Sequence, residues 1–189
     1  MQRPMTTPSL ATKWLNAIGY QLVWFALVIG AAHEATGWPL VAGALFIAIQ
    51  VTLSHRIAGE CRLLGVALLC GLVVDGVPAA LGWWHYASPT PSLPSGGAPA
   101  WILVLWMSFA TTLTRSLSLI RFRPGWAALL GAIGAPMAYL GAARGWAAVI
   151  LPQPDYPALA WLAVTWGVAL PVLAHMAGLA CMPSTTRPR

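Results

Sequence analysis

Six long apolar runs leave this 189-residue chain little choice of environment. A helix needs about 20 mainly apolar residues to cross the hydrocarbon core of a bilayer. The runs predict membrane spans at Trp14–Ala32, Pro39–Ser54, Leu63–Gly82, Trp101–Ile120, Trp126–Ala143 and Ala158–Cys181. Charged residues make up only 7% of the chain, too few to cover the surface of a soluble domain. We therefore expect an all-α, polytopic membrane helix bundle over residues 14–181.

The cations predict which way the bundle is inserted, because loops on the cytoplasmic side of a membrane are rich in Lys and Arg. Nine of the ten fall on one side if the chain crosses six times, and only Arg144 falls on the other. The nine are Arg3, Lys13, Arg56, Arg62, Arg115, Arg121, Arg123, Arg187 and Arg189. Both termini are then cytoplasmic, and we expect residues 1–13 and 182–189 to be short disordered tails.

The sequence also disfavours a nucleic-acid-binding protein, a zinc or disulfide-rich protein, and a secreted protein. The cations are scattered singly, without the basic stripe that indicates nucleic-acid binding. The three cysteines lack the spacing of a zinc site or a disulfide framework, so we predict no metal and no cofactor. A secretory signal in place of the first span is an alternative, but the span has 19 residues, more than the usual signal core of about 7–15. Asn16 and Gln21 within it also favour a helix packed in a bundle.

Asp75 is the most informative residue, since it is the only acid inside a predicted span. It lies about 18 Å from the start of that span, near the middle of the membrane, at 1.5 Å of rise per residue. Pro78 cannot donate a hydrogen bond to the carbonyl of Val74, so a kink is predicted beside Asp75. Broken helices next to ionisable groups are typical of transporter sites. A carboxyl that hydrogen-bonds a neighbouring helix and fixes packing is the alternative.

Other polar side chains are predicted near the same layer. Ser108, Thr111, Thr112 and Arg115 are spaced to share one face of the fourth span, and Ser108 has the depth to meet Asp75. Gln21, Gln50 and His175 have similar estimated depths nearer the cytoplasm, and Glu60 falls in an adjoining loop. We expect these groups to form one polar vestibule with Asp75 as its floor. For Arg115, extension of its side chain to water is an equal alternative.

Aromatic and small residues have simpler interpretations. Trp83, Trp84, Tyr86 and Trp101 flank a predicted flexible loop at Ser88–Pro99, and we interpret them as anchors at the membrane interface. The glycines and alanines from Gly131 to Ala142 predict a tightly packed fifth helix.

Four stretches together resemble a bacterial family of small polytopic inner-membrane proteins, domain of unknown function 2878. They are LNAIGYQLVWFALVIGAA, ECRLLGVALLCGLVVDG, PAWILVLWMSFATTLTRSL and LLGAIGAPMAYLGAARG. The resemblance covers roughly residues 14–147 and implies a bacterial inner-membrane location without an established activity. It places Glu60, Asp75, Trp106, Phe109, Thr112, Ser116, Pro136 and Tyr139 in family-like stretches.

A second resemblance is local. The segment from Ala174 to Gly178 is similar to the last catalytic helix of rhomboid proteases, but Ser108 lacks the flanking glycines of their nucleophile. The function that we favour is a non-catalytic membrane scaffold or accessory protein, with the lipid bilayer and other membrane proteins or lipid as partners. A permease for a small solute or lipid that uses Asp75, and a membrane enzyme that modifies lipid, remain alternatives.

Overall fold

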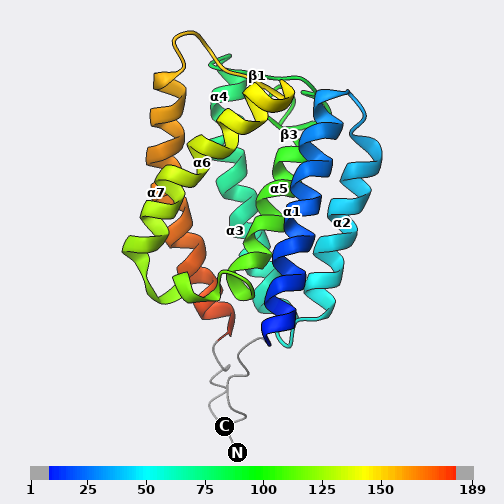
Figure 1. Cartoon of the computed structure of the whole chain (residues 1–189), viewed down its shortest axis with the longest axis vertical. Coiled ribbons are helices and arrows are strands. Elements are labelled where there is room, and N and C mark those ends of the chain that lie inside the picture. Colours follow the sequence, from blue (N-terminus) through cyan, green and yellow to red (C-terminus); the bar gives the residue numbers. More distant parts are fainter. Residues whose placement is uncertain (1–8, 182–189) are drawn as a thin grey trace, which may run out of the picture.

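The computed structural model describes residues 9–181, and most of them belong to one bundle of helices (Figure 1). The helices are α1 (Leu10–Ala32), α2 (Gly37–Thr52), α3 (Ile57–Val74), α4 (Gly76–Ala80), α5 (Ala100–Thr114), η1 (Ser118–Phe122), α6 (Pro124–Trp146) and α7 (Tyr156–Cys181). The predicted all-α bundle is confirmed. The predicted tails at residues 1–8 and 182–189 lie outside the described residues.

Four of the helical segments are long and apolar enough to cross a membrane. They are α1, α3 continued by α4, α6 and α7; the other two apolar helices, α2 and α5, have 16 and 15 residues. A helix suits this environment because it satisfies its own backbone hydrogen bonds, which lipid cannot do.

Several predicted helix ends were wrong. Helix α1 begins at Leu10, where the Ser9 hydroxyl accepts a hydrogen bond from the Thr12 amide at 3.1 Å. Helix α3 begins at Ile57 rather than Leu63, so Glu60 lies in its first turn and not in a loop. Helix α5 ends at Thr114, and the predicted remainder of that span turns back as η1. Arg115 therefore follows the helix and does not continue its polar face.

Helix α5 occupies the centre of the bundle, with α1 and α2 on one side and α6 and α7 on the other (Figure 1). Close approach of α6 and α7 depends on Gly131, because a β-carbon there would clash with the backbone carbonyl of Trp166. This confirms the predicted packing role for Gly131, but not for Gly134 and Gly141, whose β-carbon positions have no neighbour closer than 4.0 Å. Helix α1 begins and α7 ends at the same end of the bundle, which we call the terminal end (Figure 1).

Short strands lie at the opposite end, which we call the strand end (Figure 1). Strand β1 (His85–Tyr86) pairs with β4 (Val149–Ile150), and β2 (Ser92–Leu93) pairs with β3 (Ala98–Pro99), both antiparallel. The predicted flexible loop is thus folded onto the bundle. Ser88 is buried, and its hydroxyl donates to the Ala31 carbonyl at 2.8 Å.

Candidate functional site

Asp75 lies at a break between α3 and α4, as Pro78 predicted. The Asp75 amide still donates to the Gly71 carbonyl at 3.0 Å. The carbonyl of Val74, which Pro78 leaves without its helical donor, accepts a hydrogen bond from the indole Nε1 of Trp161 on α7 at 2.9 Å. A neighbouring helix therefore replaces the lost hydrogen bond and holds the break in place.

The carboxyl group of Asp75 is enclosed by aromatic donors. Its Oδ1 accepts hydrogen bonds from the hydroxyls of Tyr86, at 2.8 Å, and Tyr139. Its Oδ2 accepts one from the indole Nε1 of Trp106 at 2.6 Å, and Trp84 donates to the Tyr86 hydroxyl at 2.9 Å. We call these five residues the aspartate cluster. It joins α3, α5, α6 and the strand end around a side chain that is 0% exposed.

The aspartate cluster is arranged to keep its tyrosines as donors. Burial raises the pKa of the Tyr86 hydroxyl well above its ordinary value, and the nearby Asp75 carboxyl raises it further. The phenol therefore stays protonated at neutral pH. An indole N–H can only donate, so Trp106 also needs an acceptor at this position.

Trp106, and not Ser108, is the residue of α5 that meets Asp75. Trp106 and Ser108 are two residues apart, which separates their side chains by about 200° around the helix, at 100° per residue. Trp106 reaches α3 because Gly71 has no side chain: a β-carbon there would lie 2.7 Å from the indole Cδ1. Ser108 is fully buried, and its hydroxyl has no hydrogen-bond partner within residues 9–181. The Thr112 hydroxyl donates to the Phe109 carbonyl of its own helix.

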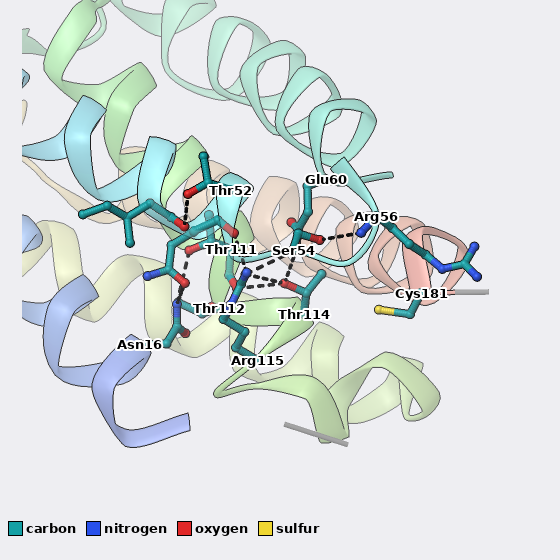
Figure 2. A network of polar contacts seen from close by, with 12 residues as sticks. Asn16, Thr52, Ser54, Arg56, Glu60, Thr111, Thr112, Thr114, Arg115 and Cys181 are labelled. Atoms are coloured by element: carbon teal, nitrogen blue, oxygen red, sulfur yellow. Dashed lines mark hydrogen bonds and ion pairs between the residues drawn. The ribbon is translucent and has the colours of Figure 1, made fainter. Parts of the chain in front are cut away.

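A second group of polar residues lies at the terminal end, where Glu60 and Arg115 form a buried ion pair (Figure 2). Arg115 Nη1 lies 3.2 Å from Glu60 Oε1, which also accepts from the Thr114 hydroxyl at 2.9 Å. Arg115 Nη2 donates to the Gln50 carbonyl of α2. Of the two alternatives for Arg115, extension to water is therefore wrong, since the side chain is paired and buried.

Asn16 extends this Glu60–Arg115 network to α1 (Figure 2). Its Nδ2 donates to Gln50 Oε1 at 3.2 Å and lies 3.4 Å from the Thr111 hydroxyl. Its Oδ1 accepts from the Ser116 hydroxyl at 2.7 Å. The network therefore locks together α1, α2, α3 and the end of α5.

The predicted single vestibule was wrong. Gln50, Glu60 and Arg115 do meet, but Gln21 and His175 are exposed on the outside of the bundle. The carboxyl group of Asp75 belongs to the separate aspartate cluster. Equal depth did not bring these residues together because depth says nothing about the direction in which a helix turns each side chain.

A lateral cavity of about 440 Å³ lies between α1, α5, α6 and α7. Most of its surface is apolar or aromatic. Its lining includes Tyr20, Gln21, Trp24 and Val28 from α1; Trp101, Trp106 and Phe109 from α5; Leu130, Gly134, Ala138, Tyr139 and Ala142 from α6; Val149; and Trp166 and Leu170 from α7. Trp106 and Tyr139 therefore form its inner wall and hold the Asp75 carboxyl behind them.

The lateral cavity has a mouth and a closed end. Gln21 of α1 and Leu130 of α6 both line it and are both exposed, so the mouth lies between these two helices. Towards the strand end it is bounded by Trp101 and Val149, each 2% exposed. On the outside at that end, Trp146 of α6 packs against Trp24 of α1, with ring centroids 5.9 Å apart.

Sequence reasoning missed the partners of Asp75. Trp84, Tyr86 and Trp101, interpreted as interfacial anchors, are buried, whereas Trp83 is exposed. Trp106 and Tyr139 were named only as residues in family-like stretches, without a predicted contact to Asp75. The available signal was a set of aromatic N–H and O–H donors in apolar runs around a lone acid, because such donors need an acceptor when buried.

No group of three potential metal ligands occurs within residues 9–181.

The apolar helices and the buried polar clusters define a membrane-embedded helical bundle. The chain belongs to the family described as Protein of unknown function (DUF2878), whose model matches residues 13–172. Comparisons with curated proteins and with solved structures gave no match.

Proposed function

We propose that this chain is a multi-pass protein of the bacterial cytoplasmic membrane, with six crossings and both termini in the cytoplasm. The described cations support this orientation. Lys13, Arg56, Arg62, Arg115, Arg121 and Arg123 belong to segments at the terminal end (Figure 1), whereas Arg144 lies in the last turn of α6, near the strand end. We further propose one transmembrane domain over residues 14–181, with short cytoplasmic tails.

Within that membrane, we propose that the protein is a non-catalytic accessory protein that holds one apolar chain of a membrane lipid. The observation that carries this proposal is the lateral cavity, whose mouth lies between two helices at the outer surface. In a bilayer this surface faces lipid tails. A cavity of about 440 Å³ falls within the usual range for ligand sites, about 300–1,000 Å³.

The lining of the lateral cavity suits a hydrocarbon chain. Flat apolar ring faces are provided by Tyr20, Trp24, Trp106 and Trp166. The amide group of Gln21 lies at the mouth. A lipid chain gains no hydrophobic free energy by moving from the bilayer into this cavity, since both are apolar. Binding therefore depends on van der Waals contact with the walls, and the fit of the cavity decides affinity.

The buried polar residues support a holding role better than transport or chemistry. The Asp75 carboxyl lies behind Trp106 and Tyr139 and accepts hydrogen bonds on both oxygens. Glu60 and Arg115 neutralise each other. A permease that used Asp75 would have to open this cluster, and a lipid-modifying enzyme would need a reactive group at the cavity surface.

Filling the lateral cavity tests the proposal. Gly134 lines it, and a β-carbon there would have only Leu130 Cδ1 nearby, at 4.0 Å. Gly134→Leu should therefore occupy the cavity without disturbing the backbone. Gly141 lies on the same helix outside the lining, with nothing within 4 Å of its β-carbon position, so Gly141→Leu is the matched control.

Each full-length protein is purified in mild detergent, and the retained lipid per chain is measured by mass spectrometry. We expect about one lipid per chain in the parent and in Gly141→Leu, and a loss of most of it in Gly134→Leu. Equal retention by the two variants, or no lipid on the parent protein, would overturn the proposal.

A further inference from the structure

We infer that the bound lipid comes from the cytoplasmic leaflet, with an anionic phosphate headgroup at Arg123 and its chain directed up into the lateral cavity. This inference rests on the proposed function and on the proposed orientation. It adds the direction of the ligand, its leaflet and the charge of its headgroup.

The direction follows from the shape of the lateral cavity. Its closed end is formed by Trp101, Ala142 and Val149, all buried near the strand end. At its mouth, Gln21 lies at the middle of α1 and Leu130 lies six residues from the start of α6, so both are nearer the terminal end than the closed end is. A chain that enters at the mouth must therefore place its tip towards the strand end and leave its headgroup on the side of the terminal end.

A separate shallow groove lies on the surface beside the start of α6, nearer the terminal end than Leu130. It is lined by Arg123, Gly125, Trp126 and Leu129, all exposed. Trp126 and Leu130 are four residues apart, so they lie one above the other on the same face of α6. Leu130 is seven residues beyond Arg123, or about 10 Å along the helix. The upper part of a lipid chain spans this distance along Trp126 and Leu129 before it enters the cavity.

Arg123 is suited to the headgroup. A guanidinium binds phosphate oxygens through paired hydrogen bonds. Trp126 lies beside it, and tryptophan is a residue typical of the membrane–water interface. The neighbouring Arg121 is already engaged, since its side chain donates to the Ser118 carbonyl at 3.0 Å and contacts the Cys181 sulfur. Arg123 is therefore the basic side chain that can bind a phosphate group in this groove.

The charge around the groove favours an anionic lipid. The whole sequence has four acidic residues. Glu60 is paired with Arg115 inside the bundle, Asp75 is enclosed in the aspartate cluster, and Asp155 pairs with Arg144 near the strand end. Glu34 follows α1 at the strand end as well. Within residues 9–181, no exposed acid at the terminal end competes for Arg123.

Arg123→Gln tests the inference, with Arg144→Gln as the control. Both arginines lie at ends of α6, Arg123 just before its start and Arg144 in its last turn. The full-length proteins are incubated with equimolar phosphatidylglycerol and phosphatidylcholine that carry identical chains. The ratio of the two lipids retained after purification is then measured by mass spectrometry.

We expect the parent protein and Arg144→Gln to favour phosphatidylglycerol about fivefold, the effect of about 1 kcal/mol for one basic side chain at an anionic surface. Arg123→Gln should hold a similar total amount of lipid at a ratio near one. A ratio unchanged by Arg123→Gln would refute the headgroup site while leaving the cavity proposal intact. A ratio lost in Arg144→Gln instead would place the headgroup in the opposite leaflet. Absence of lipid from the parent protein would remove both proposals.

Discussion

Replacing Asp75 with alanine removes the acceptor at the centre of the aspartate cluster. Three hydrogen bonds are lost, from Tyr86, Tyr139 and Trp106. A hydrogen bond between helices in a membrane contributes about 0.6–2 kcal/mol, so Asp75→Ala should lower the free energy of unfolding by about 2–6 kcal/mol. The loss should also loosen Trp106 and Tyr139, which form the inner wall of the lateral cavity.

Asp75→Asn separates packing from charge. Because the Trp106 indole only donates, the amide oxygen of the asparagine must face Trp106. Its NH₂ group then faces the hydroxyls of Tyr86 and Tyr139, which can accept. Asparagine thus keeps a contact with all three residues, but the tyrosine hydroxyl hydrogens lose their acceptor, at a cost of about 1–3 kcal/mol. If packing is the role of Asp75, Asp75→Asn should keep both the fold and the bound lipid.

The measurement is thermal unfolding of each purified variant in detergent, followed by fluorescence-detected size exclusion, together with the retained lipid. Leu69→Ala, at a position that is 61% exposed on the same helix, is the control and should change stability by less than about 0.5 kcal/mol. An Asp75→Ala protein as stable as the parent would refute the argument. A stable Asp75→Asn protein that has lost its lipid would instead support the charge-based role.

Two further predictions concern the ion pair and the topology. Glu60→Leu leaves Arg115 buried without its partner and should lower the free energy of unfolding by about 3–5 kcal/mol, whereas the double variant Glu60→Leu/Arg115→Met should recover most of that loss. Thermal unfolding of the single and the double variant measures the difference. Equal stability of these two variants would contradict the pairing. Reporter fusions after Arg62 and Arg123 should report the cytoplasm and a fusion after Ser95 the opposite side. A non-cytoplasmic signal at Arg62 or Arg123 would reject the proposed orientation.

Much of the fold was predictable because lipid leaves the backbone few alternatives. The apolar runs alone indicated an all-α bundle, four of whose helices are long enough to cross a membrane, and Pro78 indicated the break at Asp75. Gly131 and its small neighbours indicated the close contact of α6 with α7. These predictions rest on local chemistry, namely the length of an apolar run, a missing N–H and a missing side chain, which each short segment carries by itself.

The site was decided by the tertiary structure. In a soluble helix the contrast between polar and apolar faces reveals the buried side, but here lipid and core are both apolar, so the sequence does not indicate how each helix is turned. Trp106 rather than Ser108 therefore met Asp75, and Gln21 and His175 ended on the outer surface. The sequence by itself determined the class of protein, its helices and the lone acid. Only the packing of the helices decided which donors enclose that acid and where a cavity remains between them.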